Sequence, residues 1–134
     1  MKTTVYTLLL TGLVATSTFA QTVSFQNKTA TTLGAPTFTI KVSTPTQNAS
    51  QVAQKNQSTT QSITIPSLLG GNSIEITDDS TVTISATVGG TQVLLGKKKK
   101  EIQRSGKKFQ KAQSYNLVLE KDGDSYSLDI KSAQ

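Results

Sequence analysis

Apolar residues alternate with polar residues along most of this chain, and this period of two constrains the fold more than any other feature. In the longest run, TVTISATV, every second position is apolar: Val82, Ile84, Ala86 and Val88. Successive side chains of a β-strand point to opposite faces of a sheet, so the run predicts a strand with one buried face. The same alternation predicts strands within residues 22–26, 37–42, 62–66, 73–77, 91–95, 115–120 and 125–130.

Turn-forming residues separate the predicted strands. Gly89 and Gly90 follow the longest run, and Asp122 and Gly123 stand between the last two. Asp-Gly between alternating runs is a strong signal for a β-hairpin. No segment shows an apolar stripe at helical spacing. These features predict an all-β fold, an antiparallel β-sandwich of Ig-like architecture with about seven or eight strands.

The first twenty residues, MKTTVYTLLLTGLVATSTFA, follow the order of a secretory signal peptide. Lys2 is followed by an apolar run over residues 5–15 and by small residues at Thr18 and Ala20. A membrane anchor is the alternative, but the run is shorter than the roughly 20 residues that a membrane-spanning helix needs. We therefore predict cleavage after Ala20, a single β-sandwich domain over residues 21–134, and a secreted or periplasmic location.

The composition removes most catalytic chemistry, because the chain contains no histidine, cysteine or tryptophan. Nucleophilic triads and most zinc, copper or iron sites require His or Cys. A carboxylate pair remains formally possible among the acids Glu75, Asp78, Asp79, Glu120, Asp122, Asp124 and Asp129, but most of them lie at predicted turns, where Asp is favoured for backbone reasons. A calcium site at Asp122 and Asp124 is a second possibility, but a hairpin turn explains these two residues with fewer assumptions. We predict a protein that is not an enzyme, with no catalytic residue, no metal site and no cofactor.

One segment departs from the strand pattern. Residues 43–62 contain fifteen Ser, Thr, Asn or Gln among twenty residues, which predicts a mobile connection between two strands. Three Asn-x-Ser/Thr triplets begin at Asn27, Asn48 and Asn56. Each would be a glycan acceptor in a eukaryotic secreted protein, although a chain this rich in Ser and Thr contains such triplets by chance.

Positive charge is concentrated in residues 96–111, GKKKKEIQRSGKKFQK. This segment carries eight of the 14 basic residues of the chain and one acid, Glu101. Its local charge of +7 exceeds the +6 of the whole chain, so the basic character belongs to one patch. The candidate anion-binding residues are Lys97, Lys98, Lys99, Lys100, Arg104, Lys107, Lys108 and Lys111.

Two local structures fit the basic segment. In the first, a strand runs out to Arg104, turns at Ser105 and Gly106, and returns over residues 107–119 as a long hairpin. In the second, the segment is a mobile loop, extended by repulsion between like charges. Ile102 and Phe109 are the large apolar residues of the segment. They are candidates for contact with a membrane, or they fix the segment to the rest of the domain.

The basic segment predicts binding to anionic surfaces, such as phospholipid or lipopolysaccharide head groups and acidic glycans. The alternative without a binding role is a solvated arm whose lysines prevent edge-to-edge sheet pairing. A different function class is a protein-interaction module, such as a surface-structure subunit or a secreted effector that docks on an acidic protein. Nucleic acid is less favoured, because Phe109 is the only aromatic residue of the segment.

Overall fold

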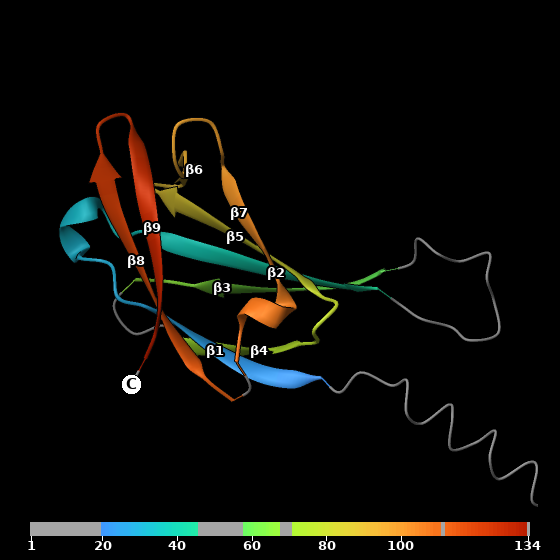
Figure 1. Cartoon of the computed structure of the whole chain (residues 1–134). Coiled ribbons are helices and arrows are strands. Elements are labelled where there is room, and N and C mark those ends of the chain that lie inside the picture. Colours follow the sequence, from blue (N-terminus) through green and yellow to red (C-terminus); the bar gives the residue numbers. More distant parts are fainter. Residues whose placement is uncertain (1–19, 46–57, 68–70, 111, 134) are drawn as a thin grey trace, which may run out of the picture.

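A computed structural model of the chain describes residues 20–45, 58–67, 71–110 and 112–133, which form nine strands and two short 3-10 turns (Figure 1). These described residues contain no α-helix. The predicted signal peptide lies outside them except for Ala20. The elements are β1 (Gln21–Asn27), η1 (Thr31–Leu33), β2 (Thr37–Pro45), β3 (Ser58–Ile65), β4 (Gly71–Ile76), β5 (Thr81–Val88), β6 (Thr91–Gln92), β7 (Glu101–Ser105), η3 (Gly106–Lys108), β8 (Ser114–Asp122) and β9 (Ser125–Ser132).

The strands form a four-stranded and a five-stranded sheet. The first has the order β4-β1-β8-β9, and the second has the order β3-β2-β5-β6. The fifth strand of the second sheet, β7, pairs with the first half of β5, whereas β6 pairs with its end. The pair β1 and β8 is parallel, with Ser24 opposite Ser114. The first sheet is therefore mixed, whereas the sequence predicted a wholly antiparallel arrangement.

Buried side chains from both sheets form one hydrophobic core. Along β5, Val82, Ile84 and Ala86 are fully buried and Thr81 is exposed, as the alternation predicts. Phe25 and Leu117 of the first sheet belong to the same core cluster. The predicted all-β fold is confirmed at the level of two sheets that share a core. The Ig-like architecture stays a prediction.

The ends of the polar segment 43–62 are strands and not an irregular connection. β2 continues to Pro45, and β3 begins at Ser58, opposite Pro45. The hydroxyl groups of Ser43 and Thr60 lie 3.3 Å apart across the two strands. Polar side chains suit the exposed face of a sheet, and Ile40 opposite Ile63 sets the register from the buried face. Residues 46–57 lie outside the described residues.

The first Asn-x-Ser/Thr triplet has a structural role. Asn27 is buried, its side-chain nitrogen donates to the Pro36 carbonyl oxygen at 2.9 Å, and its side-chain oxygen accepts from the Thr29 N–H at 3.1 Å. Thr29 in turn accepts a hydrogen bond from the Leu119 N–H. The folded chain therefore offers no free amide at Asn27. Asn48 and Asn56 lie outside the described residues.

The predicted Asp-Gly hairpin joins β8 to β9. Asp122 is the last residue of β8 and lies opposite Ser125, the first of β9. Gly123 has a φ of 59°, in the left-handed region that only glycine adopts freely. The Ser125 hydroxyl donates to the Asp122 carbonyl oxygen and closes the turn. The hairpin is confirmed, and backbone geometry accounts for the glycine.

Candidate anion-binding edge of the five-stranded sheet

The basic segment does not form the projecting hairpin considered from the sequence. Its strand β7 pairs with β5 in the five-stranded sheet, whereas β8 pairs with β1 and β9 in the other sheet. The segment therefore crosses from one sheet to the other along the side of the molecule. Its basic residues lie along the edge strand β7 and at its two ends, and not on an arm in solvent.

Two apolar residues explain why the segment lies against the domain. Phe109 is only 6% exposed, and its ring makes edge-to-face contacts with Phe25 at 5.5 Å and Tyr115 at 5.2 Å between ring centroids. Ile102 is half-buried and packs against the core. Burial of such a side chain contributes about 1.5–3 kcal/mol, which a projecting hairpin would lose. The buried ring of Phe109 therefore anchors the basic segment to the core, and in this conformation it is not exposed to a membrane.

A loop of four lysines precedes β7. We call residues 96–100 the basic loop. Its base is fixed by backbone hydrogen bonds from the Leu95 N–H to the Lys99 carbonyl oxygen and from the Gly96 N–H to the Tyr126 carbonyl oxygen. Gly96 has a φ of 79°, which favours glycine at this bend. The side chains of the loop lysines are exposed, so a fixed backbone presents them to solvent.

A second, smaller basic group follows β7. We call Lys107 and Lys108 of η3 the basic turn. The Ser105 hydroxyl oxygen accepts from the Lys107 N–H, and the Gly106 N–H donates to the Ser80 carbonyl oxygen at 2.8 Å. Ser80 is itself buried at the turn between β4 and β5. Both lysines are exposed, at the opposite end of β7 from the basic loop.

The side chains of the basic segment form no ion pair within the described part of the chain. Among the described residues there is one ion pair, between Lys131 and Asp129 at 2.9 Å. It involves no residue of the basic segment. No carboxylate of the described residues is therefore paired with a candidate cation. The described candidates, all exposed and none in an ion pair, are Lys97, Lys98, Lys99, Lys100, Arg104, Lys107 and Lys108.

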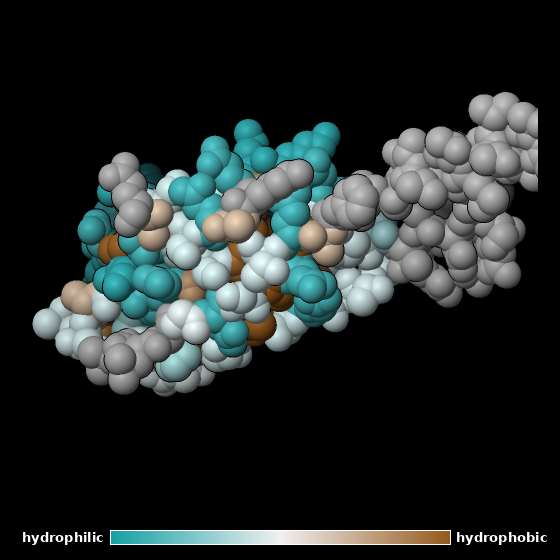
Figure 2. Space-filling model, turned by 90° about the horizontal axis from the view of Figure 1, so that it is seen from below, coloured by the Kyte–Doolittle hydropathy of each residue, from teal (hydrophilic) through white to brown (hydrophobic). Residues whose placement is uncertain are grey.

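The structure spreads these cations along a line. Six residues, the five of β7 and Gly106, separate Lys100 from Lys107, which places the two basic groups roughly 20 Å apart at about 3.4 Å per residue. That distance exceeds the screening length of about 8 Å at physiological salt. Figure 2 shows the face seen from below in Figure 1, where hydrophilic residues of all kinds lie in several separate groups. Lys111, the eighth candidate, lies outside the described residues.

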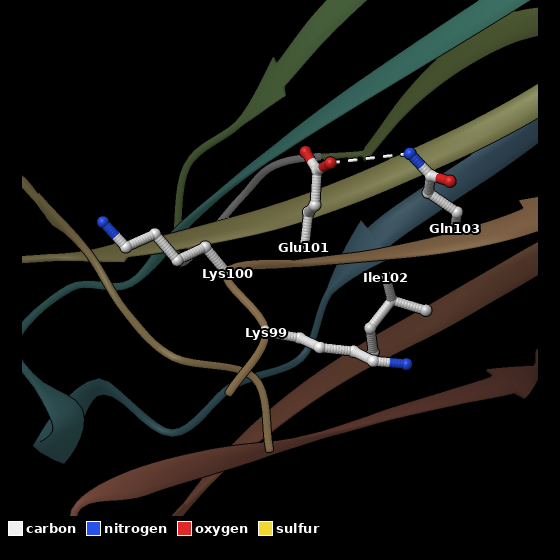
Figure 3. Close-up of a pocket in the computed structure, with 5 residues that line it drawn as sticks. All are labelled: Lys99, Lys100, Glu101, Ile102 and Gln103. Carbon is white, nitrogen blue, oxygen red and sulfur yellow. Dashed lines mark hydrogen bonds between the residues drawn. The ribbon is translucent and has the colours of Figure 1, made fainter. Parts of the chain in front are cut away.

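An open hollow of about 380 Å³ lies where the basic loop meets β7 (Figure 3). Lys99 and Ile102 point to one side of the chain, and Glu101 and Gln103 point to the other. The Gln103 amide donates to the Glu101 carboxylate at 3.5 Å. Because Glu101 is part of the lining, the hollow is poorly suited to a single small anion. The cations suit an extended or planar polyanion better.

Acidic residues approach each basic group without pairing with it. The Gly96 contact with Tyr126 places the basic loop at the same end of the molecule as the β8–β9 turn, which carries Asp122 and Asp124 (Figure 1). The basic turn contacts the β4–β5 turn, where the Ser105 hydroxyl donates to the Asp78 carbonyl oxygen. By formal charge, the four lysines of the basic loop exceed the two aspartates of the β8–β9 turn, whereas the two lysines of the basic turn equal the two aspartates, Asp78 and Asp79, of the β4–β5 turn. The basic loop is thus the stronger part of the candidate site.

Leu94 is a surface residue that the sequence analysis missed. It is 37% exposed and is the one large hydrophobic side chain classed as exposed among the described residues. It lies three residues before Lys97, and its carbonyl oxygen accepts from the Tyr126 N–H. The alternation in TQVLL could have predicted this exposure, because Val93 and Leu95 face the core and leave Leu94 on the outer face. The structure thus places an apolar side chain beside the basic loop.

The described residues contain no group of three or more His, Cys, Asp or Glu side chains that could hold a metal ion. No helix within them has the length and apolar character needed to cross a membrane. Comparisons with protein-family models, curated proteins and solved structures find no match. A functional proposal for this chain therefore depends on its own residues.

Proposed function

We propose that the protein binds polyanionic surfaces through the basic loop and β7, without catalysing a reaction. One observation carries this proposal: seven exposed cations lie along one edge of the molecule, and none of them forms an ion pair with another residue that the structure describes. The ligand class is phospholipid or lipopolysaccharide head groups or acidic glycans. A secreted or periplasmic location, predicted from the first twenty residues, would bring the protein into contact with such surfaces.

The magnitudes favour a large ligand over a small one. A Lys or Arg near an anionic membrane contributes about 1 kcal/mol. The four loop lysines would then supply about 4 kcal/mol, which corresponds to a dissociation constant of about 1 mM. All seven described cations would supply at most about 7 kcal/mol, which corresponds to a dissociation constant of roughly 10 µM. Because the two groups lie roughly 20 Å apart, only an extended chain or a surface can engage both.

The experiment measures binding to immobilised heparin and to vesicles that contain anionic phospholipid, at low and high salt. We expect binding to weaken roughly tenfold or more as salt screens the charges. The double variant Lys97→Glu with Lys98→Glu should weaken binding by about 2 kcal/mol or more, roughly 30-fold. These lysines are exposed and make no side-chain contact that holds the fold, so the variant should remain folded.

A matched control separates a local effect from a change in net charge. Lys28 and Lys41 are also exposed, but they lie outside the basic segment. The variant Lys28→Glu with Lys41→Glu changes the net charge by the same amount and should retain most of the binding. Equal loss in both variants would show that only the overall charge matters. Binding that does not respond to salt would contradict the proposal outright.

A second candidate function, docking on an acidic protein, has one observation in its favour. The outer edge of β7 has no neighbouring strand among the described residues, because β7 pairs only with β5. An open strand edge can accept the backbone of another polypeptide. A partner retained in pull-downs but absent from heparin and vesicle assays would favour this function over the first.

For the architecture, we infer a β-sandwich of Ig-like character. Two features support it: the sheets share one core, and β3 contacts β4, so matching edges of the two sheets lie on the same side. Aligned sandwiches have strand directions within about 30° of each other. A crystal structure in which the two sheets cross near 90° would exclude an aligned sandwich.

A further inference from the structure

We propose that the outer edge of β7 is a strand-addition site for an extended acidic segment of a partner protein. The proposal rests on the second candidate function, because it takes an acidic protein as the partner. It does not depend on lipid or glycan binding. It combines three observations: an open backbone edge, a half-buried isoleucine, and cations at both ends of the same strand.

The backbone hydrogen bonds show which groups of β7 face outward. The Gly106 N–H donates to the Ser80 carbonyl oxygen, so the pair 80 and 106 is hydrogen-bonded. In an antiparallel ladder such pairs alternate, so Ile102 and Arg104 also direct their N–H and C=O groups toward β5. The N–H and C=O groups of Glu101, Gln103 and Ser105 then point away from β5, to the open edge. A partner strand would find donors and acceptors at these three residues.

The side chains of β7 define what an added strand should carry. Ile102 lies opposite the buried Ile84, and Arg104 lies opposite the buried Val82, so both project to the core side of the sheet. Lys99 points to the same side as Ile102 (Figure 3). Along this face the order is basic, apolar, basic. A residue on an added strand lies directly across from its neighbour, so the complement of Ile102 and Arg104 is an apolar and an acidic residue two positions apart. Lys99 lies three residues before Ile102, just outside β7, so a second acidic residue on the other side of the apolar one would lie near it.

The same charges discriminate between strands. Lysines on an exposed edge discourage pairing with neutral or basic strands, which protects the free protein from aggregation. An acidic strand replaces this repulsion with attraction, so the edge rejects most strands and accepts one class. Ile102 contributes because its remaining exposed surface, next to the hollow of about 380 Å³, would be covered by the apolar residue of the partner.

The test uses a blocked peptide with the sequence SETVTES, in which acidic and apolar residues follow this order. We expect binding to the protein, measured by fluorescence anisotropy of a labelled peptide or by chemical-shift changes in β7. The peptide SKTVTKS, with reversed charges, should not bind. The peptide SEGGGES, which keeps the acids but has little strand propensity, should bind at least tenfold more weakly.

A backbone variant tests strand pairing directly. Gln103→Pro removes an N–H that faces the open edge and leaves the bonds between β5 and β7 intact, and proline is tolerated in edge strands for this reason. The matched control Gln103→Ala keeps the N–H. We expect the proline variant to bind SETVTES at least tenfold more weakly than the alanine variant. Both should bind heparin equally, which distinguishes this site from the polyanion site.

The outcomes that would overturn the inference are specific. Absence of binding by SETVTES would do so, as would equal affinity for SETVTES and SEGGGES, because charge alone would then explain the binding. Equal affinity of the Gln103→Pro and Gln103→Ala variants would exclude backbone pairing at this edge. If the peptide fails but Gln103→Pro abolishes self-association, then the occupant is a second copy of the chain and not an acidic partner.

Discussion

Gly106 lies against the backbone of Thr77 so closely that a Cβ atom on Gly106 would be 1.9 Å from the Thr77 carbonyl oxygen. This contact joins the end of β7 to the turn between β4 and β5. The hydrogen bond from the Gly106 N–H to Ser80 reinforces it, and Ser80 in turn accepts from the Thr77 N–H at 3.0 Å. The contact fixes where the basic segment leaves the five-stranded sheet.

We predict that Gly106→Ala destabilises the protein by about 1–3 kcal/mol, because the new methyl group forces the β4–β5 turn and β7 apart. Thermal or urea unfolding measures the change. Gly71→Ala is the control, since a Cβ there would meet its nearest neighbour, in Gln26, at 3.4 Å. If the two variants are equally stable, then the close approach of Gly106 and Thr77 is not a constraint on the fold.

The aromatic cluster that anchors the basic segment predicts two different losses of stability. Phe109→Ala leaves a cavity beside Phe25 and should cost about 3–5 kcal/mol. Tyr115→Phe keeps the ring contacts and removes only the hydroxyl that accepts from the Gln110 N–H at 2.7 Å, so it should cost about 1 kcal/mol. Urea denaturation compares the two. A small decrease in the free energy of unfolding for Phe109→Ala would contradict the role of Phe109 as the anchor of the basic segment.

Leu94 separates the two kinds of polyanion that the basic loop could bind. Its exposed side chain could enter a lipid interface but has no apolar partner on an acidic glycan. We predict that Leu94→Ser weakens binding to anionic vesicles roughly tenfold and leaves binding to heparin unchanged. Vesicle co-sedimentation measures binding to the lipid surface, and heparin affinity chromatography measures binding to the glycan. An equal effect on both ligands would remove Leu94 from the lipid contact.

The exposed ion pair on β9 predicts a shifted titration. The hydrogen bond from the Lys131 ammonium to the Asp129 carboxylate, together with the attraction between their charges, raises the pKa of Lys131 above its ordinary value of 10.5. Because the folded-state pKa is raised, any stability from the pair is fully present below pH 10.5 and is lost as the pH rises through the folded-state pKa. The effect is confined to alkaline conditions and shrinks with salt.

NMR titration of the lysine Cε signals checks this prediction. In the variant Asp129→Asn, the pKa of Lys131 should fall back toward its ordinary value, because the carboxylate that raises it is gone. The variant should change stability little near neutral pH, since exposed ion pairs contribute little. An unchanged Lys131 titration in the variant would mean that the pair does not persist in solution.

The strand pattern could be predicted because alternation is a local property of the chain. The alternation of Val82 and Ile84 with polar neighbours predicts the buried face of β5 without information about any distant segment. The Asp-Gly hairpin at Gly123 was predicted for the same reason, since only a few residue pairs allow that turn. The parallel pairing of β1 with β8 could not be predicted, because it joins segments about ninety residues apart.

The sequence alone determined that this chain is all-β, that it lacks the side chains for most catalysis, and that its positive charge lies in one segment. The position of that charge on the folded molecule depends on contacts between distant segments. Burial of Phe109 and Ile102 holds the basic segment against the domain. The local sequence pattern alone could not show that this arrangement is more stable than a projecting hairpin. The pairing of β7 with β5 then separates the basic loop from the basic turn and leaves one strand edge open, because pairing depends on contacts between distant segments.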